Sequence, residues 1–388
     1  MADPGSLASD PVVVVGAGLT GGLISLALAR LGLAVIQVAP PSPAPGSSAR
    51  GATATGLSYG SLSLGTTGRA WRNLERRHGP LGWTACGVKL HDRGWLGRRL
   101  TLAGSRVDGP TLMAALPRAL AAAGVRQRPA LVQGLEAGGD GGWRLQLLDL
   151  RETTFCPGIQ GGPLGVPPLG VPPVGVAPKG TSILEARQVV LAAGAGCLEL
   201  WPPLARLLGI SWAGVLALEN NPRTNPWLRQ VARGRLVLNQ KEQRLGLEDQ
   251  AGCLAKDRWI VDASAAPWGP KGVLVGQISL VHPLDGPQRA PDPHGMEERL
   301  RQGLQRWDPQ LAALEGTYRQ IPVAFGLQGR ALVGPVAGAP GLWTFTGFRS
   351  PFSTAPPAAV QLAQLLAARL MNQAQPAMGR TGQPDQNK

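Results

Sequence analysis

The sequence predicts an α/β protein in which a Rossmann-like dinucleotide-binding domain is interleaved with a smaller mixed-sheet domain. The chain opens with a complete β-α-β unit over residues 12–38, and this unit carries a glycine motif. It closes in the same style, with a strand over 342–346, a glycine turn at Gly347 and a helix over about 355–371. Between 201 and 323 the pattern changes to short strands that alternate with turns, which predicts a second sheet on the substrate side.

The opening unit has the residue types that dinucleotide binding requires. Valines 12–15 predict a buried strand, and Gly16, Gly18 and Gly21 occupy the glycine positions of G-x-G-x-x-G. Gly16 makes the tight turn, Gly18 lets a pyrophosphate approach the backbone, and Gly21 allows close packing of helix and strand. The helix predicted over 22–31 would offer its N–H groups and dipole to phosphates. A glycine-rich turn without a ligand is the alternative, which the complete unit disfavours. We therefore expect a bound dinucleotide.

The acidic residue that usually holds the ribose of a dinucleotide is missing. The second strand, predicted over 33–38, runs into Ala39 and Pro40 where Asp or Glu is expected. Ribose recognition must then come from backbone groups, from Gln37, or from the loop with Ser47 and Ser48. Because the phosphate-side features are intact, atypical cofactor binding is favoured over weakened binding.

Composition fits a globular chain that is long enough for two interleaved domains. It has 388 residues, 44% of them hydrophobic, and a mean hydropathy near zero. The apolar run 19–38 is interrupted by glycines and Arg30 and belongs to the nucleotide unit, so no membrane span is expected. The first ten residues lack a secretory signal, and the four cysteines are far apart without a Cys-x-x-Cys pair. These features predict a cytoplasmic protein with reduced thiols and no metal site.

The chain is strongly basic, with a formal net charge of +14. Arginine makes up 32 of the 38 cationic residues, scattered singly or in pairs such as Arg76-Arg77 rather than in runs. A solvated basic surface is the simpler interpretation. Attraction to polyanions such as RNA, or to acidic substrates, is the functional one, although no nucleic-acid module signature supports it.

The segments between the two ends follow recognisable patterns. Helices are predicted over 69–77, 112–123 and 295–307, the second capped by Asp108 or Thr111. Strands are predicted over 130–135, 143–150, 185–191, 235–238, 259–263 and 272–280. Residues 161–180 repeat Gly-Val-Pro-Pro and predict a disordered excursion that interrupts a hairpin. The polar tail 372–388 is also expected to be disordered.

Taken in order, these pieces resemble the FAD-dependent oxidoreductases of the D-amino-acid oxidase, glycine oxidase and sarcosine oxidase superfamily. The matches are the opening glycine unit, Val107-Asp108-Gly109-Pro110 before a helix, 189–194 as V-V-x-A-A-G, and Val333-Gly334-Pro335 followed by 342–347. The resemblance implies FAD as the cofactor and a chain that passes repeatedly between two domains. The FAD-binding domain would comprise 1–66, 101–200 with the 161–180 insertion, and 324–371, and the substrate domain 67–100 and 201–323.

The resemblance also implies positions around the FAD. Those facing the pyrophosphate would be Gly16, Ala17, Gly18 and Gly21, and those along the ribityl and phosphate side Ser48, Ala49, Arg50 and Gly51. Val132 would bracket the adenine, and Ala193 and Gly194 would pass beside the cofactor. The loop over the flavin would include Gly347, Phe348, Ser350, Ser353 and Thr354. The helix after it would point its N-terminus at the pyrimidine ring, where it stabilises the anionic reduced flavin.

Departures from the family pattern bear on the substrate. The flavin-face loop 346–356 is shorter than T-G-x-x-x-x-G and lacks the second glycine, and Gln328 replaces an acidic residue. Region 321–326 has no arginine like that of G-x-R-P, which in relatives helps to hold a substrate carboxylate. Arg349 in the loop is then the first candidate for the anchoring cation, followed by Tyr59 and Arg319. A surface role for Arg349 and a core role for Tyr59 are the alternatives.

Three functions remain open. The leading one is an FAD-dependent oxidoreductase that oxidises a small amine or amino acid by hydride transfer to flavin. The second is a tRNA-modifying oxidoreductase that resembles the FAD half of the bifunctional wobble-uridine enzymes and uses the basic surface. The third is a non-catalytic FAD-fold protein. A small-molecule amine is therefore the expected partner, nucleic acid is not favoured, and the sequence gives no oligomeric state.

Overall fold

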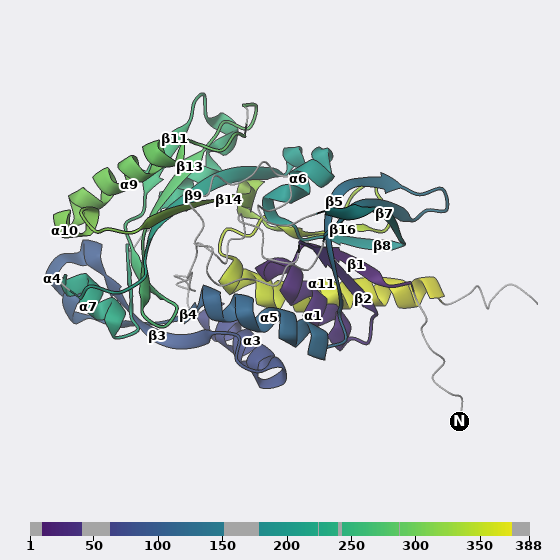
Figure 1. Ribbon diagram of the computed structural model, residues 1–388, viewed down its shortest axis with the longest axis horizontal. Helices are drawn as coiled ribbons and strands as arrows, with labels where there is room; N and C mark the ends of the chain where they lie inside the picture. Colours follow the sequence, from purple (N-terminus) through teal and green to yellow (C-terminus); the bar gives the residue numbers. More distant parts are fainter. Residues whose placement is uncertain are drawn as a thin grey trace, which may run out of the picture.

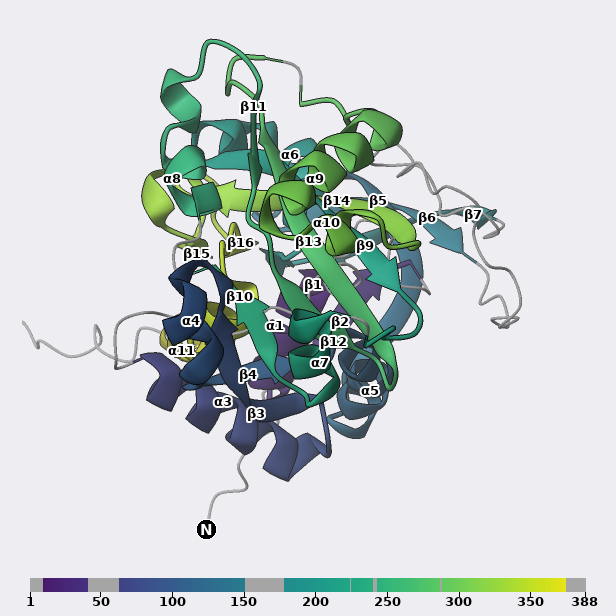
Figure 2. The same ribbon diagram turned by 90° about the vertical axis from the view of Figure 1, so that its left-hand side faces the viewer.

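A computed structural model describes residues 10–40, 63–150, 178–223, 225–239, 243–286 and 288–374. The described residues form two large sheets with helices packed against them (Figures 1 and 2). No helix in these ranges combines the length and apolar character needed to cross a membrane.

The first sheet is built around the opening β-α-β unit, in the order β15-β16-β8-β1-β2-β5-β6-β7. Strands β16, β8, β1, β2 and the start of β5 are parallel, whereas β15, β6 and β7 are antiparallel to their neighbours. Because β1 lies centrally, between β2 and β8, all its valines are buried. The predicted Rossmann-like α/β class is confirmed. The strands are β1 (Val12–Val15), β2 (Val35–Ala39), β5 (Arg126–Ala137), β6 (Trp143–Leu150), β7 (Pro178–Ala186), β8 (Gln188–Leu191), β15 (Leu332–Pro335) and β16 (Leu342–Thr346).

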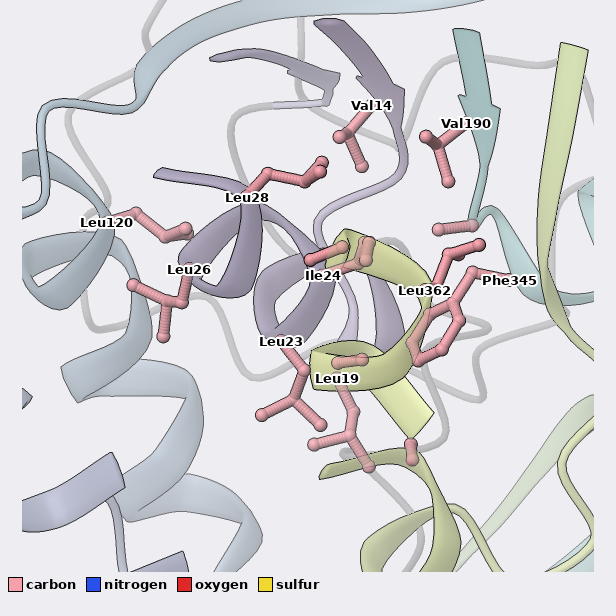
Figure 3. Close-up of a cluster of buried hydrophobic side chains, with 14 of the residues drawn as sticks. Val14, Leu19, Leu23, Ile24, Leu26, Leu28, Leu120, Val190, Phe345 and Leu362 are labelled. Carbon is pink, nitrogen blue, oxygen red and sulfur yellow. The ribbon is translucent and has the colours of Figure 1, made fainter. Parts of the chain in front are cut away.

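Both faces of this sheet are covered, which explains its continuous apolar runs. On one face, Ile24 of α1 lies beneath Val14 and Val190, and Leu23 belongs to the same buried cluster (Figure 3). The alternate side chains, such as Val13, point to the opposite face and pack against β6 and α6 (Cys197–Leu200). The helices of the first face are α1 (Leu19–Arg30), α3 (Ser63–His78), α5 (Gly109–Ala122) and α11 (Pro351–Ala374).

The second sheet has the order β14-β9-β13-β12-β10-β3-β4, with β11 added beside β13. Helix α9 buries Met296, Leu300 and Leu304 on one face, and α8 lies on the other, where its Leu247 contacts Val281. Its strands are β3 (Trp83–Leu90), β4 (Leu102–Val107), β9 (Leu208–Leu218), β10 (Leu236–Leu238), β11 (Arg258–Val261), β12 (Ala265–Trp268), β13 (Gly272–Val281) and β14 (Thr317–Gly326). Its helices are α4 (Gly94–Arg99), α7 (Pro226–Ala232), α8 (Gln243–Asp249), α9 (Pro293–Trp307) and α10 (Pro309–Ala312).

Helix α11 contains two adjacent prolines, and α3 compensates for them. Pro356 and Pro357 have no N–H, so the carbonyls of Phe352 and Ser353, four residues earlier, lose their helical donors. Trp71 Nε1 donates to Phe352 O at 2.7 Å, and Thr67 Oγ1 donates to Ser353 O at 2.8 Å. Both donors are buried and one helical turn apart on α3. The α3–α11 contact therefore satisfies two carbonyls that the α11 sequence leaves without partners.

We expect Thr67→Val, which keeps the side-chain shape, to lower the free energy of unfolding by about 1–3 kcal/mol, because it leaves a buried carbonyl unsatisfied. The matched control is Thr354→Val. Thr354 is exposed, and its Oγ1 donates to Ser350 O, which already accepts backbone N–H groups. Urea denaturation of both variants measures the difference. Equal stability of the two variants would show that Ser353 O finds another donor.

Several predicted boundaries change in the structure. Asp108, rather than Thr111, caps α5, since its Oδ2 accepts the N–H of Thr111 at 3.1 Å. The single strand expected over 185–191 is wrong: it divides at Arg187, because β7 pairs with β6 while β8 pairs with β1. Residues 178–180 of the Gly/Pro-rich excursion begin β7, and 161–177 lie outside the described residues. Helix α11 continues through 372–374, and 375–388 are likewise outside the description.

Five strands of the second sheet have no counterpart in the predictions, namely β3, β4, β9, β12 and β14. β9 is buried at every position, so it shows no alternation of apolar and polar residues, and β14 pairs with it along ten residues. β3 and β4 form an antiparallel pair at the far edge. Because β4 belongs to this sheet, the first chain segment of the second sheet extends to Val107, beyond the boundary at residue 100 that was expected for the substrate domain.

Candidate functional site

The turn between β1 and α1 can be made only with glycine at two positions. Gly16 has φ +116°, and a Cβ there would lie 2.6 Å from Ala192 O of the neighbouring strand end. A Cβ on Gly21 would lie 2.0 Å from Gly16 O. Backbone atoms cannot retreat as a flexible side chain can, so the glycines bring α1 directly against the turn, as the sequence motif requires.

The N-terminus of α1 is open to an anion. Gly18 is its N-cap, and neither a capping side chain nor an acidic residue of the first turn competes for the free N–H groups. Ala17 and Gly18 therefore leave backbone donors and the positive helix end facing the same point. This donor set fits the pyrophosphate of a dinucleotide.

The ends of β8 and β16 meet beside this turn. Ala192 N donates to Val15 O at 2.9 Å, and Thr20 Oγ1 donates to Ala192 O at 3.3 Å. Thr346 Oγ1 donates to Gly194 O at 3.3 Å, and Gly194 adopts φ +60°. Ala193 and Gly194 thus pass between the glycine turn and the end of β16. The carboxyl ends of three parallel strands converge here, where α/β sheets bind their ligands.

The loop after β16 is tied to the second sheet. Gly347 has φ +76°, its carbonyl accepts Gly326 N at 2.9 Å, and a Cβ on it would lie 2.7 Å from Leu208 Cδ2. Phe348 is buried against Phe345, with ring centroids 4.8 Å apart. The helix begins at Pro351, not near 355 as predicted, so only residues 347–350 form the loop.

The positions within the first turn of α11 differ in exposure. Ser353 is buried and Thr354 is exposed. The N–H groups of both residues donate to Ser350 O, at 3.0 and 3.1 Å. The serine and threonine side chains therefore lie at the helix start rather than along an extended loop.

The structure limits which groups could recognise the ribose of a dinucleotide. Gln37 is 2% exposed, and its Nε2 donates to Ser25 Oγ of α1 at 3.3 Å. This removes Gln37 from the groups that could hold a ribose. Val132 lies on β5 where the β5–β6 register shifts, just beyond the part of β5 that pairs with β2. Ser48, Ala49, Arg50, Gly51 and Tyr59, like Ser47, fall outside the described residues.

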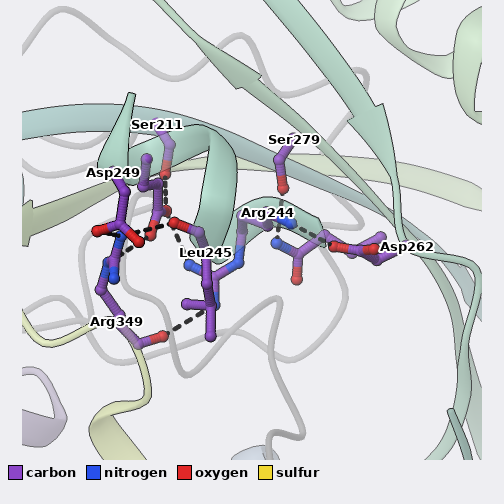
Figure 4. Close-up of polar contacts among 9 residues, drawn as sticks. Ser211, Arg244, Leu245, Asp249, Asp262, Ser279 and Arg349 are labelled. Atoms are coloured by element: carbon purple, nitrogen blue, oxygen red, sulfur yellow. Dashed lines mark hydrogen bonds and ion pairs between the residues drawn. The ribbon is translucent and has the colours of Figure 1, made fainter. Parts of the chain in front are cut away.

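Arg349 is bound by carboxylates of α8. Its Nε lies 3.1 Å from Glu248 Oε2 and its Nη2 2.6 Å from Asp249 Oδ1, and Nη2 also donates to Leu245 O at 2.7 Å. Figure 4 shows the side chain extending from the loop to α8. Substrate anchoring by Arg349 stays a prediction, but its charge is already balanced in this arrangement.

The partner of Arg349, Glu248, is a residue that the sequence interpretation missed. Its side chain is fully buried, and it also accepts Arg244 Nη1 at 2.8 Å and Ser211 Oγ at 2.9 Å. Arg244 Nη2 in turn donates to the backbone oxygen of Arg349 at 2.9 Å. The spacing of Arg244 and Glu248, four residues apart, was the only local signal available.

Arg319 lies elsewhere on the second sheet. On β14 it pairs with Val215, on the face opposite α9, and its Cζ is 4.5 Å from the ring centroid of Trp268. Burial lowers the pKa of Arg319, and the charge of Glu219 opposes this. Gly326 is the residue of β14 that contacts the 347–350 loop, and Arg319 is seven residues away from it, or about 23 Å along the strand. The structure therefore does not bring Arg319 and Arg349 together.

Thiol chemistry is not available at the strand ends. Cys197 is fully buried, and burial raises the pKa of its thiol to about 11, against weaker opposing hydrogen bonds with Thr346 and Ala193. Burial also raises the pKa of Cys86 to about 11. Neither thiol forms an appreciable amount of thiolate near neutral pH.

We expect a thiol-specific alkylating reagent at pH 8 to modify Cys253, which is exposed, and to leave Cys86 and Cys197 unmodified. The experiment uses a variant in which the fourth cysteine, Cys156, is replaced by serine. Only the thiolate reacts, and raised pKa values keep both thiols protonated until the pH approaches 11. Mass spectrometry of the labelled peptides measures this. Rapid labelling of Cys197 in the folded protein would contradict the buried position.

Comparison with known proteins identifies the architecture. Glycine oxidase from Geobacillus kaustophilus overlaps 95% of this chain and 96% of its own, with a TM-score of 0.58 at 17% identity. The chain has the glycine oxidase fold. The match to iminodiacetate oxidase from Chelativorans sp. covers 92% of this chain and 95% of that chain, with a TM-score of 0.59 at 17% identity. The match to L-proline dehydrogenase from P. horikoshii covers 93% of this chain and 94% of that chain, with a TM-score of 0.58 at 13% identity. No family model and no curated protein matches the sequence.

Proposed function

We propose that this chain is an FAD-dependent oxidoreductase that oxidises a small amine or amino acid. The observation that carries the proposal is the set of glycines at the adjoining ends of β1, β8 and β16, within a glycine oxidase fold of nearly full length. The similar structures are named for oxidation of glycine, iminodiacetate and proline, all of which carry an amine beside a carboxylate. Their shared chemistry favours the first of the three functions that the sequence left open.

The cofactor side of the site follows from the backbone. Gly16, Ala17, Gly18 and Gly21 would hold the FAD pyrophosphate through the open α1 N-terminus. Ala193, Gly194 and the 347–354 segment would border the flavin, with Val132 on the adenine side. Bound FAD would supply the two-electron acceptor. The N-terminus of α11, at Pro351, would direct its positive end toward that acceptor and favour its reduced, anionic form.

The substrate side would be the face of the second sheet opposite α9. This face is mainly apolar, with Val215 and Leu274 buried beside Trp268. An amine that arrives neutral needs no strong base, only a C–H bond held over the flavin, so a dry apolar wall suits the reaction. An anchoring cation would add orientation, and Arg349 and Arg319 are the described candidates.

The visible spectrum of the purified protein tests the proposal. We expect a yellow protein that releases FAD, rather than FMN or NAD, on denaturation. Anaerobic addition of glycine, proline or iminodiacetate should then bleach the flavin for at least one of them. A colourless protein that FAD cannot reconstitute would overturn the proposal, and a stable flavin that no amine bleaches would overturn its substrate class.

A further inference from the structure

Exposed apolar side chains gather on the short helix α4. Trp95 is 68% exposed, Leu96 42% and Leu100, which directly follows the helix, 51%. Helix α4 lies together with α7 at the left-hand end of the molecule in Figure 1, the end that faces the viewer in Figure 2. Large apolar side chains clustered on a surface mark contact sites more often than isolated ones do.

The underlying structure fixes these side chains in an outward position. A Cβ on Gly97 would lie 1.7 Å from Leu90 O, so α4 rests directly on β3 at this glycine. Trp95, two residues away, then points to the opposite side of the helix. Buried Lys89 donates through Nζ to Arg99 O at 3.2 Å and to Leu100 O at 2.8 Å, which secures the C-terminal end. The exposure of Trp95 and Leu100 is therefore a feature of a well-supported helix.

Cationic side chains surround the apolar ones. Arg99 Cζ lies 5.3 Å from the Trp95 ring centroid, and Arg93 is also exposed. Arg229 of α7 and Arg233, which directly follows α7, are exposed at the same end of the molecule. Asp92 is the acidic residue beside α4, and the whole chain has a net charge of +14. We refer to Trp95, Leu96 and Leu100 with Arg93 and Arg99 as the α4 surface.

We propose that the α4 surface docks the protein on an anionic lipid bilayer. Indole and leucine side chains would enter the boundary between headgroups and acyl chains, and the arginines would pair with lipid phosphates. A second copy of the chain suits this surface poorly, because its arginines would face one another. Three apolar side chains, two on a six-residue helix and one directly after it, also provide little of the roughly 1,200–2,000 Å² that a stable protein interface buries. The proposal does not depend on the flavin chemistry.

Sedimentation with lipid vesicles tests it on the full-length protein. We expect binding to vesicles of mixed phosphatidylglycerol and phosphatidylcholine, and little binding to phosphatidylcholine alone. Trp95→Ser and Leu96→Ser should each weaken binding, the tryptophan change by about tenfold or more. The matched control is Ile183→Ser, which removes a 60% exposed side chain from β7 on the other sheet and should leave binding unchanged. Thermal melting of each variant checks that it is folded.

The remaining outcomes separate the bilayer from other partners. Arg99→Glu should weaken binding to the mixed vesicles, because it reverses a charge that faces the lipid phosphates. If the Trp95→Ser protein binds the mixed vesicles as well as the unchanged protein does, the proposal is wrong, because the binding would then reflect net charge alone. Equal binding to neutral and anionic vesicles would overturn it too. So would a dimer in solution that Trp95→Ser dissociates, which would make α4 a contact between copies.

Discussion

Gly18→Val is expected to give a folded protein that retains much less FAD. Gly18 caps α1 with φ −72° and ψ −171°, an extended conformation that an L-residue adopts without strain. The substitution should therefore cost no more than about 1 kcal/mol of stability, mainly through a poorer N-cap. Its side chain would, however, stand where the pyrophosphate meets the backbone, and should weaken FAD binding by about tenfold or more. Flavin absorbance after gel filtration, with a melting curve, measures both effects.

Gly21→Ala should behave differently from Gly18→Val, because its Cβ would meet the Gly16 carbonyl at 2.0 Å. Helix α1 would have to move away from the turn, so both the melting temperature and FAD retention should fall. Gly65→Ala is the control: Gly65 is an exposed position of α3 with open space around it, and alanine favours helix there. A Gly18→Val protein with full flavin content would show that the pyrophosphate does not lie against this turn.

The cofactor half of the fold could be predicted because its signals are local. Gly21 is required by its close approach to the carbonyl of Gly16, five residues earlier, and Asp108 caps α5 from three residues away. The second sheet could not be predicted in the same way. The residues of β9 are buried on both faces, so they show no periodicity, and their partners on β14 lie about a hundred residues further along the chain.

The candidate site also could be predicted only where its signals are local in the sequence. The sequence places Arg349 in the loop after β16, and the structure agrees, but nothing near Arg349 in the sequence indicates its partners. Glu248 and Asp249 come from a helix about a hundred residues earlier, which only the packing of α8 against this loop brings into contact. A missing arginine in the 321–326 region suggested that Arg349 was free for substrate. Its pairing with two carboxylates favours a positioning role instead.

Glu248→Gln should lower the free energy of unfolding by about 3–5 kcal/mol, the cost of leaving buried charges without their partner. Glu248 is fully buried between Arg244 and Arg349, and both arginines are at most 14% exposed. Arg349→Ala should cost less, because Arg244 and Ser211 still satisfy the carboxylate. The control is Glu185→Gln in the exposed Arg144–Glu185 pair of β6 and β7, which should change stability by no more than about 0.5 kcal/mol. Urea denaturation gives all three values.

The kinetic comparison then separates a positioning role of Arg349 from substrate anchoring. If Arg349 holds the loop, Arg349→Ala and Glu248→Gln should perturb the flavin spectrum in the same direction, and their double variant should show a coupling of about 0.5–3 kcal/mol. The KM for a carboxylate-bearing amine and for the same amine without its carboxylate should then change alike. If Arg349 anchors the substrate, Arg349→Ala should raise only the first KM and leave the spectrum intact. We expect the first pattern, because each described donor contact of Arg349 ends on α8.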